Sequence, residues 1–333
     1  MKNFNHFIAI DWAKNNIAIA RMTAKSDKIT VTEGKFDLAD VKAYLSKLRG
    51  TKILTIEETT TSQWLYTELR HYVDRIIICD PYRNRLLSEG PKTDKVDACN
   101  LVKLLRAGLL KEVFHSGNEF IKLRKIVSAY EDLIKAGVRV KNQRYAFLSA
   151  QGKDTADEKE DNSSVLGFVL EGVDKSIMNY ESEKKRYETL FKELGKKHIA
   201  IRRQDQIPGI GYINSVKIVA RVVDPRRFST KSDYHLYCGL LKYDKISGGR
   251  SYGKRSPRYS RELKCVYKTA ANNIIGHDNY FNDYYEHLIS VRRFPEHQAK
   301  HAVARRIASV SYGVFKSGKK FNSVRGKERE SKQ

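Results

Sequence analysis

Two short apolar runs that each end in a carboxylate place the strongest limit on how this chain can fold. Residues 6–11 read HFIAID and residues 53–57 read ILTIE, so Asp11 and Glu57 directly follow core-type residues. Runs that are apolar on both faces are typical of buried central strands. Further strands are expected at residues 16–22, 28–31 and 75–79, and a helix at residues 38–48. This order predicts an α/β domain over residues 1–113, a mixed sheet with helices packed on it.

Long helical periodicity begins near residue 120. Apolar residues recur at alternating three- and four-residue spacing over residues 126–147 and again over residues 173–194. This spacing predicts two long helices within residues 114–205, an antiparallel coiled-coil arm with an acidic, polar tip at residues 152–164. A helical hairpin packed on its own chain and a dimerising coiled coil both satisfy the pattern.

The C-terminal part, residues 206–321, is expected to form a mainly α-helical domain. A loop rich in Gly, Ser and Arg interrupts it at residues 247–260, and residues 322–333 form a polar, basic tail. Short polar chain ends of this kind are often frayed.

The charge balance points to a polyanionic partner. The chain has 63 Lys and Arg against 39 Asp and Glu, a net charge of +24. Nucleic acid or an anionic membrane surface would suit this excess. Because the sequence contains no apolar run long enough to cross a bilayer, we expect DNA or RNA and no membrane. Four scattered cysteines form neither a disulfide framework nor a zinc motif, which favours a reducing cytoplasm. With DNA as the expected partner, the protein is expected to be associated with the nucleoid.

The acids are more informative than the bases. Asp94 and Asp97 are one helical turn apart and share a predicted helix face with Leu101, Leu104 and Leu105. Carboxylates on apolar faces are costly unless they are paired or bound to a cation.

For a single acid, a helix cap or an ion pair is the simpler explanation. The set of four, Asp11, Glu57, Asp94 and Asp97, favours a site for two Mg²⁺ ions, with Mn²⁺ as an alternative. Asp80 is assigned to a turn before Pro81, and Glu58 points to the opposite strand face from Glu57.

The order of the motifs resembles that of the DEDD-motif insertion-sequence transposases, relatives of the Piv-type DNA invertases. The motifs are HFIAID, IEETTT, PKTDKVDACNL, IPGIG, YCGLL and YGVFKSGKKF. The resemblance implies an RNase H-like (RuvC-like) N-terminal domain whose acidic tetrad is Asp11, Glu57, Asp94 and Asp97. It also implies a coiled-coil segment and a C-terminal transposase domain with a serine nucleophile.

The resemblance further implies recombination of donor and target DNA through a phosphoserine link, with a structured bridge RNA as guide. The family serine precedes a Leu by seven residues, which matches Ser256 and Leu263; Ser251 and Ser260 are alternatives. A serine needs activation, which we expect from metal ions on the tetrad of a facing domain or subunit, in a dimer or tetramer.

The surroundings of Ser256 are strongly basic. Candidate phosphate contacts are Arg250, Lys254, Arg255, Arg258 and Arg261. Residues 207–223 resemble a helix-hairpin-helix element, in which Gly209 and Gly211 would let backbone N–H groups approach a phosphate; a plain helix start is the alternative.

We therefore expect a metal-dependent DNA transposase or recombinase that uses a serine. One alternative is a RuvC-like nuclease that hydrolyses DNA with water, and another is a non-catalytic nucleic-acid-binding scaffold.

Overall fold

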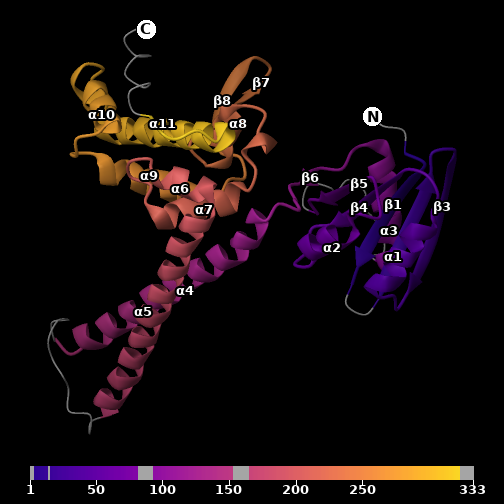
Figure 1. Cartoon of the computed structure of the whole chain (residues 1–333), viewed down its shortest axis with the longest axis horizontal. Coiled ribbons are helices and arrows are strands. Elements are labelled where there is room, and N and C mark those ends of the chain that lie inside the picture. Colours follow the sequence, from indigo (N-terminus) through magenta and orange to yellow (C-terminus); the bar gives the residue numbers. More distant parts are fainter. Residues whose placement is uncertain (1–3, 14–15, 82–92, 153–164, 323–333) are drawn as a thin grey trace. The chain divides into compact units, whose positions relative to one another are not determined.

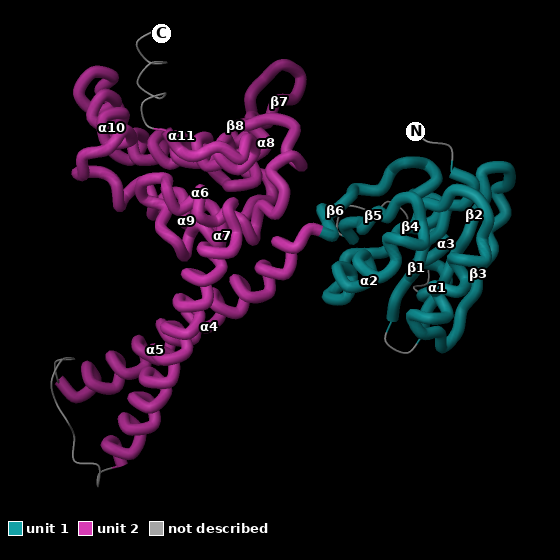
Figure 2. Tube along the Cα trace, viewed as in Figure 1, with its two compact units in different colours: residues 1–117 teal, residues 118–333 magenta. Residues whose placement is uncertain are grey.

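The computed structural model describes residues 4–13, 16–81, 93–152 and 165–322 (Figure 1). The chain divides into two compact units, residues 1–117 and residues 118–333 (Figure 2). Each unit has its own buried core and is considered by itself. Among the described residues, no helix is long and apolar enough to span a membrane.

Unit 1 is built on a six-stranded mixed sheet with the order β3-β2-β1-β4-β5-β6. The central strands β1, β4 and β5 are parallel, whereas β2, β3 and β6 join antiparallel. The strands are β1 (His6–Trp12), β2 (Ile17–Thr23), β3 (Ser26–Gly34), β4 (Lys52–Glu57), β5 (Arg75–Cys79) and β6 (Glu112–Val113). The predicted α/β architecture is confirmed, and a mixed sheet of this kind is consistent with an RNase H-like start.

The two faces of the sheet carry side chains of different size. Large residues such as Ile10 and Ile56 form one core with α1 (Leu38–Lys47) and α2 (Ser62–Leu69). Ala9, Ala18 and Ala20 face α3 (Asp94–Ala107) in a second core. Small side chains on that face let α3 lie close to β1 and β2.

Unit 2 begins with the two long helices that the periodicity predicts, α4 (Phe120–Ser149) and α5 (Val165–Lys197). They pack antiparallel, because Tyr130 donates a hydrogen bond to Glu188 whereas Arg144, farther along α4, pairs with the earlier residue Asp174. A coiled-coil geometry for this pair stays a prediction. Of the predicted polar tip, residues 153–164 lie outside the described residues, as does the tail from residue 323.

The rest of unit 2 is mostly helical. Its helices are α6 (Ile199–Asp205), α7 (Tyr212–Val222), the short 3₁₀ helix η2 (Pro225–Arg227), α8 (Lys231–Tyr237), α9 (Arg261–Ile274), α10 (Tyr280–Ser290) and α11 (Glu296–Ser317). A buried polar chain crosses their core: the Tyr234 and Tyr267 hydroxyls are hydrogen-bonded, Tyr267 contacts Ser311 Oγ at 2.8 Å, and Ser311 donates to Gln204 at 2.6 Å. Fully paired buried polar groups fix the register of the helices that carry them.

The loop predicted at residues 247–260 is partly wrong, because much of it is a β-hairpin. Strands β7 (Tyr243–Ser247) and β8 (Arg250–Arg255) pair antiparallel across Gly248 and Gly249, which both have positive φ. Every residue of both strands is exposed, so neither face needs apolar residues and the sequence shows no alternation. The Gly-Gly pair was the available signal for a tight hairpin turn.

Candidate functional site

The ends of β1 and β4 bring two acids to one edge of unit 1. Ile10 pairs with Ile56 in the parallel ladder, and Asp11 and Glu57 are each the next residue. Since side chains alternate along a strand, Asp11 shares the sheet face of Ala9, and Glu57 shares that of Thr55, the partner of Ala9. Both carboxylates therefore leave the sheet on the face that α3 covers.

The first turn of α3 supplies the other two acids. Thr93 caps this helix by accepting a hydrogen bond from the Val96 N–H at 3.3 Å, and Asp94 and Asp97 follow within the turn. The same helix buries Leu101, Leu104 and Leu105. Asp94 and Asp97 are half-buried rather than fully solvated.

Asp11 has a strongly perturbed ionisation. Burial is the largest cause, followed by the negative charges of Asp94, Asp97 and Glu57, and together they raise its pKa from 3.8 to about 6. Three carboxylates act on a fourth, which means that the acids from two strand ends and one helix share a single electrostatic environment. Among the described residues, none of these causes is a positive charge that would offset the repulsion between the carboxylates.

The set suits a hard divalent cation in its chemistry. Carboxylate oxygens are the preferred ligands of Mg²⁺ and Mn²⁺, and such an ion would relieve the repulsion that raises the Asp11 pKa. Among the described residues, however, no group of three or more His, Cys, Asp or Glu side chains is close enough together to hold an ion. The four acids are electrostatic neighbours rather than an assembled set of ligands.

Two polar residues that the sequence analysis did not single out lie beside the acids. The Asn16 amide donates to Glu33 on β3 at 2.7 Å and to Asp94 at 3.5 Å, which ties the start of α3 to the edge of the sheet. Asn16 lies in a turn-like AKNN segment and Glu33 in an exposed strand, so neither has a periodic signal. Asp80, which was assigned to a turn, is only 6% exposed.

The serine candidates belong to unit 2 and differ in their surroundings. Ser256 directly follows β8, is exposed, and makes no hydrogen bond with any described residue. Ser260 is the N-cap of α9 and accepts from the Leu263 N–H at 3.2 Å. Ser251 lies within β8 and accepts a long hydrogen bond, 3.4 Å, from the Gly253 N–H.

The predicted basic residues surround Ser256 along the chain. Arg250, Lys254 and Arg255 are exposed on β8, Arg258 is exposed in the segment that follows, and Arg261 begins α9. No described residue forms an ion pair with the three bases of β8. Their positive charge is therefore available to a phosphate.

The two glycines of the predicted hairpin element have different environments. A Cβ on Gly209 would lie 2.6 Å from the Ala270 carbonyl oxygen, so this glycine lets the turn pack against α9. Gly211, the N-cap of α7, also has a positive φ, but a Cβ added there would meet nothing within 4 Å. Only the second glycine leaves open space for a ligand.

Two family models match the chain, and together they span more than half of it. One is a DEDD transposase domain of the IS110 type over residues 8–151, which includes all four acids. The other describes the transposase IS116/IS110/IS902 family and covers residues 202–286, which include both glycines and Ser256. No curated protein sequence matches the chain.

Proposed function

We propose that this chain, which belongs to the IS110-type transposases, recombines DNA through a covalent link between Ser256 and a DNA phosphate. That the chain is a DNA transposase follows from both family models. The proposed details are the serine intermediate, dependence on Mg²⁺ or Mn²⁺, guidance by a structured bridge RNA, a dimeric or tetrameric assembly and residence on the nucleoid.

The observation that carries the metal proposal is geometric: Asp11 and Glu57 leave adjacent parallel strands on the sheet face that α3 covers, and Asp94 and Asp97 lie in the first turn of α3. The matched DEDD-type transposase domain is proposed to use a divalent metal ion. Asp11, Glu57, Asp94 and Asp97 would hold it, since each of the other three adds negative charge at Asp11. Such an ion offsets the charge that develops on phosphate oxygens during phosphoryl transfer.

In the proposed serine step, one bond to phosphorus forms for each one that breaks, and no oxidant or reductant is needed. Ser256 Oγ forms a bond to the DNA phosphorus while the bond from phosphorus to a deoxyribose oxygen breaks, and the serine proton ends on that leaving oxygen. In the second half, the hydroxyl of another strand attacks the same phosphorus and Ser256 recovers a proton. Because neither neighbour of Ser256 in sequence can act as a general base, the proposed source of activation is metal ions on the acidic tetrad of a facing domain or subunit.

The bases near Ser256 have a supporting role. Arg250, Lys254, Arg255, Arg258 and Arg261 would hold the phosphate backbone and stabilise the charge that builds up at the reacting phosphorus. Gly209 and Gly211 are proposed to add backbone contacts, for which Gly211 has the open surroundings. Such contacts position DNA without reading its sequence. Sequence choice is then left to base pairing with the RNA.

The decisive experiment is a search for the covalent adduct. Purified chain, labelled donor DNA, Mg²⁺ and any copurifying RNA are mixed, denatured and separated on a denaturing gel. A protease-sensitive DNA–protein band that disappears in Ser256→Ala supports the proposal. Cleavage products without any such band would support the water-using nuclease instead.

A further inference from the structure

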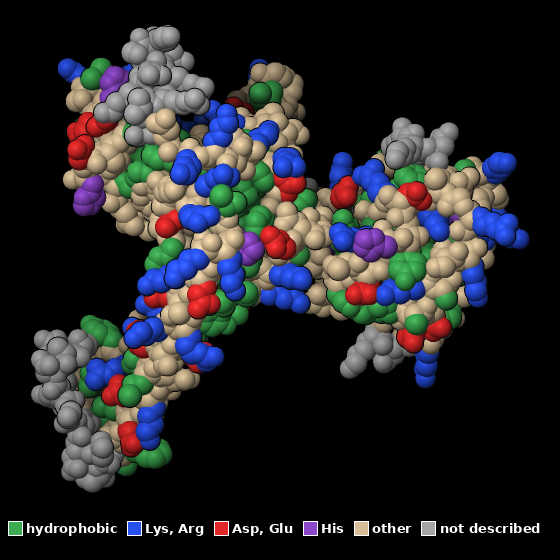
Figure 3. All heavy atoms as spheres, viewed as in Figure 1, with side chains coloured by type: hydrophobic (Ala, Val, Ile, Leu, Met, Phe, Trp, Pro, Cys, Tyr) green, Lys and Arg blue, Asp and Glu red, His purple; other side chains and the backbone are tan. Residues whose placement is uncertain are grey.

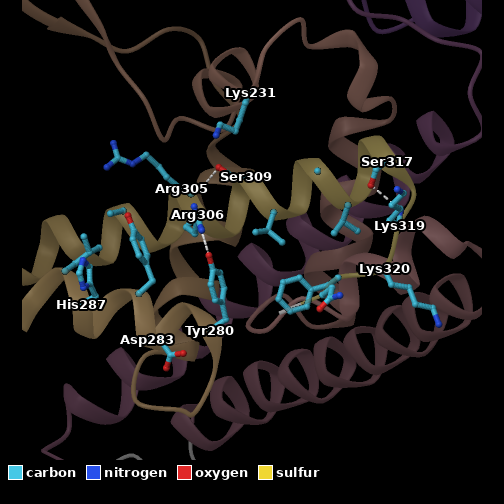
Figure 4. A pocket seen from close by; sticks show the side chains of 18 of the residues that line it. Lys231, Tyr280, Asp283, His287, Arg305, Arg306, Ser309, Ser317, Lys319 and Lys320 are labelled. Carbon is cyan, nitrogen blue, oxygen red and sulfur yellow. Dashed lines mark hydrogen bonds between the residues drawn. The ribbon is translucent and has the colours of Figure 1, made fainter. Parts of the chain in front are cut away.

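A large groove in unit 2 runs along α11, apart from the serine segment in sequence. It has a volume of about 1640 Å³ and is lined by residues of α8, α10, α11 and the segment after α11 (Figure 4). This volume exceeds that of most pockets for small molecules. The terminal YGVFKSGKKF motif contributes Gly313, Ser317 and Lys319 to its lining, a motif for which the proposed chemistry has no use.

The charge of the groove is unbalanced. Among the described residues that line it, six are cationic, Lys231, Arg292, Arg305, Arg306, Lys319 and Lys320, and the only carboxylate is that of Asp283. Figure 3 shows Lys and Arg side chains on the face of unit 2 that carries α11. Some other cations of this unit are paired, as Lys217 is with Glu131 and Lys300 with Glu296.

Lys231 and Arg305 are the two cations of the groove that are most clearly placed to bind an anion. Neither forms an ion pair with any described residue, and Figure 4 shows Lys231 reaching toward α11 beside Ser309. Both act on the neighbouring His235, which contacts Ser309 Oγ at 3.0 Å. Burial and these two positive charges lower the pKa of His235 to about 4, so the imidazole is neutral near pH 7 and adds no further positive charge beside the two cations.

The floor of the groove is open along one face of α11, because the side chains there are small. Arg305, Ser309, Gly313 and Ser317 follow one another at four-residue spacing and therefore share one helix face. A Cβ on Gly313 would meet nothing within 4 Å, which leaves an open channel between Arg305 and Lys319. Twelve residues of helix span about 18 Å, enough for two or three successive phosphates of an extended strand.

Three aromatic residues of the groove lining, Tyr280, Tyr284 and Phe321, are already engaged in other contacts, whereas Phe294 is 39% exposed. The Arg306 guanidinium lies over the rings of Tyr280 and Tyr284, at 5.5 and 5.7 Å, and donates to the Tyr280 hydroxyl. Phe321 is stacked on Phe281 at 6.1 Å. Apart from Phe294, the available chemistry is therefore that of cations and small polar groups, which suits a sugar–phosphate backbone better than base recognition.

We propose that the α11 groove binds the phosphate backbone of a single nucleic-acid strand, with Lys231 and Arg305 at one end and Lys319 and Lys320 at the other. The proposal rests on the proposed function only in taking nucleic acid as the polyanion. A DNA strand and an RNA strand share this phosphate chemistry, and the test separates them.

The test measures binding of fluorescent single strands of mixed sequence, about 20 nucleotides long, by anisotropy over a range of salt concentrations. The full chain is compared with the double variant Lys231→Gln/Arg305→Gln. We expect affinity to fall about tenfold, and the slope of log affinity against log salt to fall by about 1.4, twice the value for one phosphate contact on a single strand.

A matched control removes two charges outside the groove. Lys268→Gln/Lys300→Gln changes one exposed lysine on α9 and one on α11 that already pairs with Glu296. Gly313→Leu fills the open floor without changing charge and should also weaken binding, which separates the groove from a general loss of positive charge.

The outcomes distinguish the groove from the strand-exchange chemistry. A loss in the RNA arm alone assigns the groove to RNA, and a loss in the DNA arm alone assigns it to DNA. Equal salt slopes for the groove variant and the control variant in both arms overturn the proposal. The readout is binding of a short strand and not formation of an adduct, so the result can be interpreted even if the covalent mechanism fails. Absence of all binding by the wild type would count against both proposals.

Discussion

Asp11 and Glu57 extend two adjacent parallel strands by one residue past the paired Ile10 and Ile56, so their carboxylates leave the sheet on the same face. With Asp94 and Asp97 from α3, they form an acidic environment in which Asp11 ionises only near pH 6. Among the described residues no positive charge offsets this repulsion, so Asp11 lowers the stability of the fold at neutral pH relative to a neutral residue in its place.

Asp11→Asn should therefore stabilise unit 1 in metal-free buffer. The folded pKa of Asp11, about 6, lies above its value of 3.8 in an unfolded chain, so its stabilising effect is complete below 3.8 and is lost as pH rises through 6. After allowance for solvent screening, we expect a gain of about 1 kcal/mol in the free energy of unfolding near pH 8 and almost none near pH 4. Urea denaturation at both pH values measures it. The exposed Asp27→Asn serves as the control, and an equal gain at both pH values would contradict the explanation.

Metal binding should reverse this effect. Mn²⁺ or Mg²⁺ added near pH 8 is expected to raise the melting temperature of the wild type by several degrees, because a cation that binds only the folded state stabilises it. Asp94→Asn/Asp97→Asn should lose most of the shift and reduce strand exchange at least a hundredfold. Thermal denaturation with and without EDTA provides the measurement. If the double variant kept the full shift in melting temperature, these two residues would not be metal ligands.

The three serines should separate by function. Ser256→Ala should abolish the covalent adduct and strand exchange, whereas Ser251→Ala should keep both. Ser260→Ala removes the N-cap of α9 and should cost about 1 kcal/mol of stability while the adduct still forms. Adduct yield on a denaturing gel and urea denaturation distinguish these effects. An adduct that persists in Ser256→Ala and vanishes in Ser260→Ala would identify Ser260, the capping residue, as the nucleophile.

Gly209→Ala should mainly impair folding, whereas Gly211→Ala should mainly impair DNA binding. Both glycines have positive φ, which costs an alanine about 1 kcal/mol. Gly209→Ala also places a Cβ 2.6 Å from the Ala270 carbonyl oxygen, so it should destabilise unit 2 by about 3 kcal/mol. Gly211→Ala should fold nearly normally but bind DNA several-fold more weakly. Equal binding by Gly211→Ala and the wild type would favour a plain helix start.

Gly137→Ala tests the packing of α4 against α5. Alanine favours a helix by about 1 kcal/mol over glycine, but here its Cβ would lie 2.2 Å from the Tyr180 ring. Because the ring is buried between the helices, the clash should prevail and lower the melting temperature of unit 2. The nearby Gly172→Ala, which meets nothing within 4 Å, should raise it instead. Calorimetry of both variants measures the difference.

The elements with a strong apolar pattern could be predicted from the sequence. The strand at residues 75–79 has its predicted bounds, and the helix expected at 38–48 begins at Leu38. The α2 helix and the two residues of β6 are too short for a periodic signal, and α2 follows the polar segment ETTT. The β7–β8 hairpin could not be predicted from an apolar pattern because neither of its faces is buried.

The candidate site was accessible to sequence reasoning only in part. An acid that ends an apolar run is visible in the sequence, as at Asp11 and Glu57. The link from Asn16 to Glu33 and Asp94 depends on which strands become neighbours, and the burial of Asp80 depends on what covers the sheet edge. Both are products of tertiary structure, which local patterns do not encode.

Ser256 lies at the boundary between a weakly stabilised element and a firmly anchored one. On one side, the β7–β8 hairpin buries none of its residues, and an isolated two-stranded hairpin is only marginally stable in water. On the other side, Tyr259 packs against Gly239 and the Ser260 N–H donates to the Tyr237 carbonyl at 2.8 Å. Amide hydrogens of the hairpin should therefore exchange quickly in the free protein and slowly once its bases engage phosphates. Ser256, the proposed nucleophile, would then reach its working geometry only when substrate orders the hairpin.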